Sequence, residues 1–380
     1  MNSPNRRSLE VDFFRGLVLL VIAVDHISGS VLSKFTIHSY AFCDSAEVFV
    51  FLGGYASAAA YTSLESNRGA WPARRRFLKR SWEIYRAYLF LAVMTLLGGA
   101  TLMWLRIDTP MLQLTEWPTF LARPLGLSLD IATLRNQPYL SSVLPMYALF
   151  ALCVPFVVPL AQRKPVVALF GSLGTWLFAS RLAQGLPSAY AEGWSFNPFA
   201  WQLMFVLGML SRVQPISDAF HDSRTARWMT RAAIAVFLTF AFAKLFIETQ
   251  SPPGYMKQNL ATIRIVSFAV IAWLVAQAVH RGWIKALAQR LPSVVNIGQQ
   301  GLVCFIAGAC MSLVIDTALR MVSFGDYQWL AGLAGDTLAI GTLLALAAYW
   351  RDHKQARQQA AARIRQARPV PARVVNRRDP

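Results

Sequence analysis

Long apolar runs separated by short polar and basic segments recur along most of the chain. A membrane-spanning helix needs about 20 consecutive, mostly apolar residues. Segments of this kind occupy residues 13–33, 41–63, 82–105, 138–160, 165–182, 196–211, 230–249, 262–280, 294–317 and 328–350. The pattern therefore predicts an all-α polytopic membrane protein, a bundle of about ten transmembrane helices. The first run has no small-residue cleavage site after it, so we expect it to remain as the first membrane helix.

Composition excludes two other classes of protein. The chain has 380 residues, of which 55% are hydrophobic and only 15% are charged. A soluble globular domain carries about 25% charged residues, so this chain is too apolar for a soluble enzyme. Disordered chains combine low hydrophobicity with high charge, which is the opposite of what is found here.

The net charge of +18 is distributed unevenly between alternate loops. If the N-terminus is cytoplasmic, most of the 37 lysines and arginines lie on the cytoplasmic side, as the positive-inside rule requires. The sequence thus predicts that both termini are cytoplasmic, and the basic surplus requires no nucleic-acid partner. We expect a transmembrane domain over residues 1–350, followed by a basic cytoplasmic tail, 351–380, that is partly helical or disordered.

Ionisable residues are concentrated in the first predicted span. Asp12 and Arg15 lie near its inner end, and Asp25 and His26 lie toward its outer end. Charges inside a membrane are costly and usually face the bundle interior or a water-filled cavity. Arg15 and His26 lie eleven positions apart, a rise of about 16 Å on nearly the same helix face.

The second predicted span begins with Asp44 and Glu47, which lie on one helix face at i,i+3 spacing. We expect Glu47 and His26 at matching depth on neighbouring antiparallel helices. A histidine beside a carboxylate indicates a general base with an orienting partner. Non-catalytic explanations remain open for three of these residues: Arg15 would extend to lipid headgroups, Asp12 would interact with the helix dipole, and His26 would serve a structural role. The pair Gly53-Gly54 predicts close approach of another helix or of a ligand.

Three later features are also candidates for substrate binding. Asn197, Trp201 and Gln202 stand at the outer start of the sixth span. Lys244 either pairs with Glu248 one turn further on or holds an anionic group of a ligand. Arg86 lies beside a basic cluster at 74–80, which suits the phosphates of a cytoplasmic cofactor or simply follows from topology.

Several kinds of chemistry find no support in the sequence. We find no glycine-rich phosphate loop, no nucleophile elbow and no metal-ligand cluster. The four cysteines lack metal-ligand spacing and are interpreted as small buried apolar residues. Neither a bound metal nor a tightly bound cofactor is therefore predicted.

Five sequence blocks together resemble a known family. The first span, with its Arg-x10-His pattern, is similar to the first helix of the membrane-bound acyltransferase-3 superfamily. The remaining blocks resemble the OpgC family specifically. The blocks are 12–16, 25–27, 42–55, 197–202 and 298–305. The chain departs from the family pattern at Gly53, where a serine is expected.

The resemblance implies an inner-membrane enzyme that takes an acyl group, succinyl in the OpgC family, from cytoplasmic acyl-CoA to a hydroxyl of a periplasmic glucan. His26 would then be the base, with Glu47, Asp44 or Asp25 orienting it. Arg15 would bind donor charge, and Lys244 a donor carboxylate. Two other classes remain: a transporter with a buried proton relay, and a structural partner of a glycan-synthesis complex.

Overall fold

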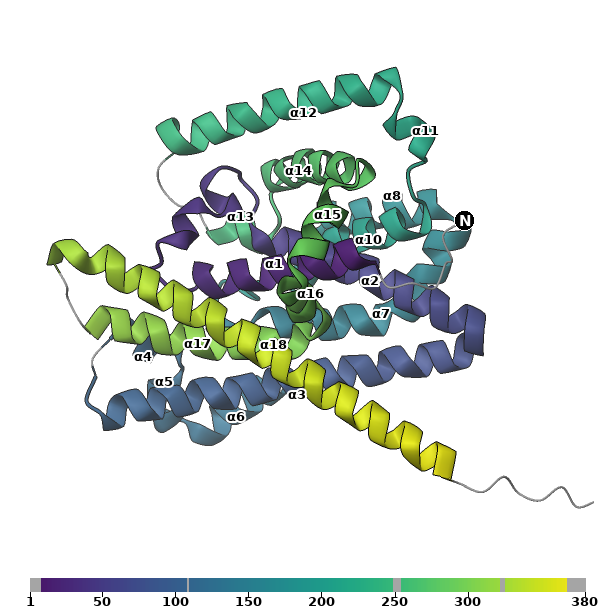
Figure 1. The fold of residues 1–380 in the computed structure, drawn as a ribbon. Coiled ribbons are helices and arrows are strands. Elements are labelled where there is room, and N and C mark those ends of the chain that lie inside the picture. The colour runs from purple at the N-terminus through teal and green to yellow at the C-terminus, as the bar shows by residue number, and fades with distance from the viewer. Residues whose placement is uncertain (1–7, 108, 249–253, 322–324, 368–380) are drawn as a thin grey trace, which may run out of the picture.

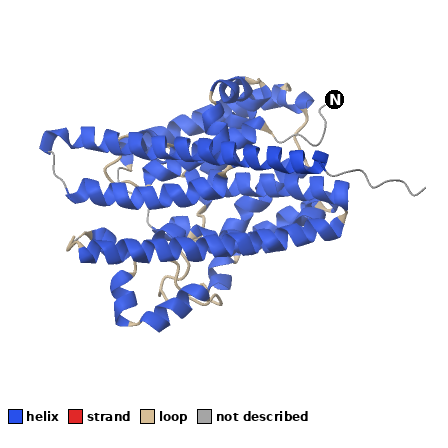
Figure 2. Ribbon diagram, turned by 60° about the horizontal axis from the view of Figure 1, so that its bottom comes forward, coloured by secondary structure: helices blue, strands red, loops and turns tan. Residues whose placement is uncertain are grey.

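The computed structural model describes residues 8–107, 109–248, 254–321 and 325–367, the side chains of 361–367 excepted. Every regular element in these ranges is helical, which confirms the predicted all-α class (Figure 2). The α-helices are α1 (Leu9–Asp25), α2 (Ser45–Arg68), α3 (Ala70–Trp104), α4 (Pro110–Leu114), α5 (Trp117–Ala122), α6 (Pro124–Ala132), α7 (Val143–Arg163), α8 (Pro165–Leu177), α9 (Ala179–Ala183), α10 (Pro198–Val213), α11 (Asp218–His221), α12 (Arg224–Phe242), α13 (Gly254–Gln258), α14 (Thr262–His280), α15 (Trp283–Arg290), α16 (Pro292–Gln299), α17 (Gly301–Met321) and α18 (Gln328–Ala367). Short 3-10 or π turns are η1 (Leu32–Phe35), η2 (Ile37–Ser39), η3 (Tyr139–Ser141), η4 (Ala243–Ile247) and η5 (Gly325–Tyr327).

Fewer helices than predicted satisfy the length and apolarity of a membrane span. Within the described residues there are six: Ala70–Trp104, Tyr139–Arg163, Arg224–Ile247, Thr262–His280, Gly301–Met321 and Gly325–Ala360. Two shorter apolar helices, Pro165–Leu177 and Pro198–Val213, add to these. The structure thus supports a multi-pass membrane protein with six candidate spans, against ten predicted from the sequence.

Part of the difference in number arises where a helix breaks or ends inside a predicted span. The predicted span 165–182 is interrupted at Phe178, between α8 and α9, and the span 294–317 is interrupted at Gln300, between α16 and α17. The predicted span 13–33 contains only α1, which is 17 residues long and ends at Asp25. An unbroken apolar run in the sequence does not reveal where the helix inside it stops.

The core of the bundle has two halves that meet at α7. One face of α7 contributes Leu144, Ala148 and Ala151 to a cluster with α1, α3 and α17. The other face contributes Phe150 and Val154 to a cluster with α2 and α10. Helix α12 lies at the edge of the bundle (Figure 1), where it buries only Ala226 and Ala233. Its remaining apolar side chains suit contact with lipid.

Two helix pairs approach so closely that glycine is required on both sides. A Cβ atom on Gly54 of α2 would lie 1.9 Å from the Phe205 carbonyl oxygen of α10, and one on Gly208 would lie 2.0 Å from the Phe51 oxygen. The close approach expected at the Gly53-Gly54 pair is thus made by α10. Helices α1 and α16 meet in the same way at Gly16 and Gly298. These contacts fix α1 and α2, which carry the candidate site.

Candidate active site

His26 is the residue at which helix α1 ends. Its Nδ1 donates a hydrogen bond of 2.7 Å to the Ile22 carbonyl oxygen one turn earlier. A carbonyl oxygen can only accept, so the hydrogen bond places the proton on Nδ1 and, in the neutral ring, leaves Nε2 as the acceptor. In the described part of the chain no hydrogen bond is formed by Nε2. The ring lies 5.7 Å from the Tyr139 ring, which is half-exposed.

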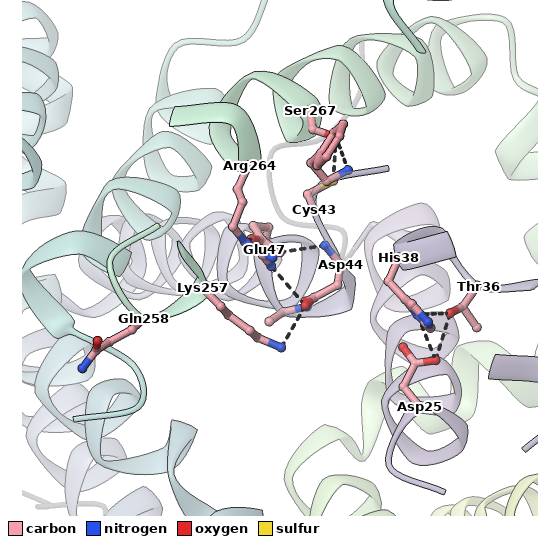
Figure 3. A network of polar contacts seen from close by, with 12 residues as sticks. Asp25, Thr36, His38, Cys43, Asp44, Glu47, Lys257, Gln258, Arg264 and Ser267 are labelled. Carbon is pink, nitrogen blue, oxygen red and sulfur yellow. Dashed lines mark hydrogen bonds and ion pairs between the residues drawn. The ribbon is translucent and has the colours of Figure 1, made fainter. Parts of the chain in front are cut away.

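Asp25, the residue before His26 in the sequence, points to a different partner. Its Oδ1 accepts a hydrogen bond of 2.9 Å from Thr36 Oγ1 and lies 3.6 Å from His38 Nδ1 (Figure 3). Successive helical residues point about 100° apart, so Asp25 and His26 do not share a direction. His38 and Thr36 belong to the loop after α1, and neither stands out in the sequence pattern.

Asp44 and Glu47 form the first turn of α2 and are bound to two basic residues from far along the chain. Arg264 on α14 bridges them: its Nε lies 2.6 Å from Glu47 Oε1, and its Nη2 lies 3.0 Å from Asp44 Oδ2. Lys257 on α13 places its Nζ 2.8 Å from the same Asp44 oxygen (Figure 3). A buried carboxylate such as Glu47 is tolerated when it is paired in this way.

The two carboxylates also cap their own helix. Asp44 accepts from the Ala46 N–H at 2.7 Å, and Glu47 accepts from the Asp44 N–H at 2.9 Å. This reciprocal arrangement is a capping box, which satisfies donors that the first helical turn leaves unpaired. Glu47 is thus committed to Arg264 and to the helix terminus, so the structure does not pair it with His26.

The expected carboxylate that orients His26 is replaced by a backbone carbonyl. Asp25, Asp44 and Lys257 lie close enough to His26 to act on it electrostatically, but the hydrogen bond of its Nδ1 goes to Ile22. The carboxylates are held by nearer donors, which offer stronger contacts than an imidazole at longer range. Asp25 and Asp44 therefore lie within electrostatic range of the histidine, and its orientation comes from the hydrogen bond to Ile22.

Two further buried carboxylates hold the loop that follows His26. Asp316 Oδ1 on α17 accepts from the Ser28 N–H at 2.7 Å, while its other oxygen pairs with Arg320. Asp336 Oδ2 on α18 accepts from the Val31 and Leu32 N–H groups, each at 2.9 Å. Neither acid was predicted from the sequence, although each is a charge inside a predicted apolar span.

At the other end of α1, Asp12 and Arg15 form a pair with 3.8 Å between Oδ1 and Nη1. Asp12 is buried, and the Arg15 guanidinium lies against Gly301, where α17 begins. The two residues lie a turn apart on α1, and their helix rise from His26 is about 16 Å for Arg15 and about 21 Å for Asp12. The structure thus brings Asp12 and Arg15 together and leaves them remote from the histidine.

Asn197, Trp201 and Gln202 are buried or half-buried and bonded to the protein itself. Asn197 caps α10 through the Phe199 N–H, at 3.0 Å, and donates to Asn259 Oδ1 at 2.8 Å. Trp201 Nε1 donates to the Lys257 carbonyl oxygen at 3.0 Å. Gln202 forms two hydrogen bonds with Ser172 of α8. Asn197 and Trp201 therefore anchor the segment that carries Lys257.

Arg86 and Lys244 lie outside this cluster. Arg86 is exposed on α3. Lys244 Nζ lies 5.6 Å from the centre of the Phe42 ring, and within the described residues it forms no ion pair with Glu248. The ammonium group that the structure places near His26 belongs to Lys257.

Comparison with known proteins identifies one family. The profile of a family described as OpgC protein matches residues 7–355, which include α1, α2, the loop between them and both basic partners. Neither the curated proteins nor the solved structures contain a match to this chain. The family match spans most of the sequence and agrees with the helices of membrane-crossing type. This chain accordingly belongs to the OpgC family and is a membrane protein that modifies glucans.

Proposed function

We propose that this chain is an O-acyltransferase of the inner membrane. It takes an acyl group, which we assign as succinyl, from acyl-CoA on the cytoplasmic side and attaches it to a hydroxyl of a glucan on the periplasmic side. The observation that carries the proposal is the state of His26. Its Nδ1 is fixed by the Ile22 carbonyl, and its Nε2 has no protein partner in the described residues.

The transfer follows from general base catalysis. Nε2 of His26 accepts the proton of a sugar hydroxyl while the hydroxyl oxygen bonds to the carbonyl carbon of the thioester. The carbon–sulfur bond then breaks, and the imidazolium returns its proton to the departing thiolate. The products are a sugar ester and free CoA, and the imidazole is regenerated.

Burial of His26 and the Lys257 ammonium group disfavour the transient imidazolium, and two neighbouring carboxylates offset part of this effect. The negative charges of Asp25 and Asp44 favour the protonated ring of His26, whereas the positive charge of Lys257 disfavours it. In the resting protein Asp44 is already paired with Lys257 and Arg264. We assign Asp25 and Asp44 to stabilisation of charge, and Glu47 to the structure of the first turn of α2.

The donor is proposed to approach from the opposite end of α1. Arg15 and Arg86 are basic residues near the predicted cytoplasmic side, where CoA carries its phosphates, and Asp12 holds Arg15 in place. Asn197, Trp201 and Gln202 support this site indirectly, because the groups we expected to bind substrate are bonded to the protein.

Mass spectrometry of periplasmic glucans tests the proposal. A strain lacking this protein would be complemented with wild type, with His26→Ala, or with His353→Ala, a matched histidine on α18 away from the site. Succinyl-sized mass increments should return with wild type and His353→Ala but not with His26→Ala. Unmodified glucan in every strain, with glucan or anion flux driven by a proton gradient, would favour the transporter instead.

A further inference from the structure

The ion cluster at the start of α2 contains one more cation than its architecture needs. Arg264 is almost fully buried and contacts both Asp44 and Glu47. Asp44 Oδ1 is also bonded to the Ala46 N–H. If Lys257 were removed, each carboxylate would still have a charged partner and a backbone donor.

Lys257 differs from Arg264 in its exposure. The Lys257 side chain is 43% exposed, whereas that of Arg264 is 7% exposed. Its ammonium group has three donors, of which the structure commits one to Asp44. Burial alone would lower the pKa of Lys257, but the Asp44 and Glu47 carboxylates outweigh it and raise the pKa, which favours the cationic form of the group.

Two aromatic residues contact Lys257, one at its backbone and one at its side chain. Its carbonyl oxygen accepts from Trp201 Nε1 at 3.0 Å, and its Nζ lies 5.8 Å from the centre of the Phe196 ring. The ammonium group acts electrostatically on both His26 and Tyr139. A half-exposed ammonium donor is thereby held within electrostatic range of the residue that would activate the acceptor hydroxyl.

We propose that Lys257 binds the free carboxylate of a dicarboxylic acyl group, so that it selects succinyl over neutral acyl donors. This inference rests on the proposed function. A thioester carbonyl placed at His26 carries its acyl chain with it, and the terminal carboxylate of succinyl then reaches a cation within the same site. An acetyl group has no carboxylate and gains nothing from Lys257.

The preference for succinyl over acetyl that Lys257 would provide can be estimated from the energy of one hydrogen bond. A hydrogen bond to a charged group contributes about 1.5–3 kcal/mol, which corresponds to about a 10- to 100-fold preference. Only the succinyl donor experiences this contribution. Loss of Lys257 should therefore change the ratio between donors instead of lowering all transfer equally.

The test compares kcat/KM for succinyl-CoA and acetyl-CoA with the same glucan, using the full chain in membranes. Wild type should prefer succinyl-CoA. In Lys257→Gln the succinyl value should fall about 10- to 100-fold with little change for acetyl. Lys257→Arg, which keeps the charge, should retain the preference. Lys34→Gln, an exposed lysine of η1 with no role here, is the control.

Three results would overturn the assignment. The first is an equal loss for both donors in Lys257→Gln, which would make the residue structural. The second is a loss of preference in Lys244→Gln, with Lys257→Gln unaffected, which would move the carboxylate site to Lys244. The third is a wild type that transfers acetyl as well as succinyl. All three leave acyl transfer intact, whereas a wild type without transfer from any acyl-CoA would contradict the proposed function itself.

Discussion

Glu47 is fully buried and depends on Arg264 for its charged partner. Breaking a buried ion pair by removing one partner costs about 3–5 kcal/mol, since the remaining charge is left uncompensated. We therefore expect Arg264→Met to lower the melting temperature of the purified protein markedly. Lys257→Met should change the melting temperature little, because Asp44 would still be paired with Arg264. Equal losses of melting temperature in the two variants would show that Lys257 contributes as much to the stability of the cluster as Arg264 does.

Asp336 holds two consecutive N–H groups of the loop that begins at His26. Asp336→Leu leaves both half-buried donors without this acceptor, and an unsatisfied donor costs up to about 1–3 kcal/mol when it is fully buried. We expect this variant to lose stability and to transfer acyl groups poorly.

Asp336→Asn keeps an oxygen at the same place, so it should retain most of both properties. Thermal unfolding and the transfer rate would be measured on the same preparations. If the asparagine variant is as impaired as the leucine variant, the negative charge is required and the hydrogen bonds alone do not explain the role of Asp336.

At the scale of single residues, the sequence located the candidate base but not its partners. His26, Asp25, Asp44 and Glu47 stand out because ionisable groups are rare inside apolar spans. Arg264 and Lys257 lie more than two hundred positions away, and nothing in a single sequence links them to α2. The Ile22 carbonyl is a backbone group, so no pattern of side chains could reveal its part in orienting the histidine.

At the scale of helices, the α2–α10 contact depends on glycine. A Cβ at position 208 would lie 2.0 Å from the Phe51 carbonyl oxygen, and the backbone cannot rotate away as a side chain can. Overpacking typically costs about 1–3 kcal/mol, so Gly208→Ala should destabilise the protein by about that amount.

Gly171→Ala on α8 is the matched control, since a Cβ atom at this position would meet no other atom within 4 Å. This substitution should be neutral or slightly stabilising, because alanine favours helix more than glycine does. Both variants would be compared by thermal unfolding in detergent. Equal stability of the two would contradict the close packing of α2 on α10.

Hydropathy predicted where apolar helices occur more reliably than where they break. The interruption at Gln300 lies in the short polar segment Gly298-Gln299-Gln300-Gly301 inside a longer, mostly apolar run. Gly298 is there because α1 approaches it, and that contact depends on a helix nearly three hundred residues earlier. Tertiary packing, which the local pattern does not contain, sets such boundaries.

Across the whole molecule, polar clusters occupy both ends of α14. Arg264 lies near its start with Asp44 and Glu47, and His280 lies at its end, 2.9 Å from Asp222. About sixteen residues of helix separate them, a rise of about 24 Å, which approaches the thickness of the hydrocarbon core. The candidate site is thus near one end of a membrane-length helix, which suits the proposed acceptor on one side of the bilayer.

Transfer across the membrane by means of His26 is the central claim. Inverted membrane vesicles would be loaded with glucan, so that the lumen represents the periplasm, and succinyl-CoA would be added outside. With wild type, mass spectrometry of the lumenal glucan should detect succinyl esters. His26→Ala should lower the rate by about 10²–10⁴-fold, the usual contribution of a general base. Equal rates in the two proteins, or esters formed only when succinyl-CoA is enclosed with the glucan, would contradict the account.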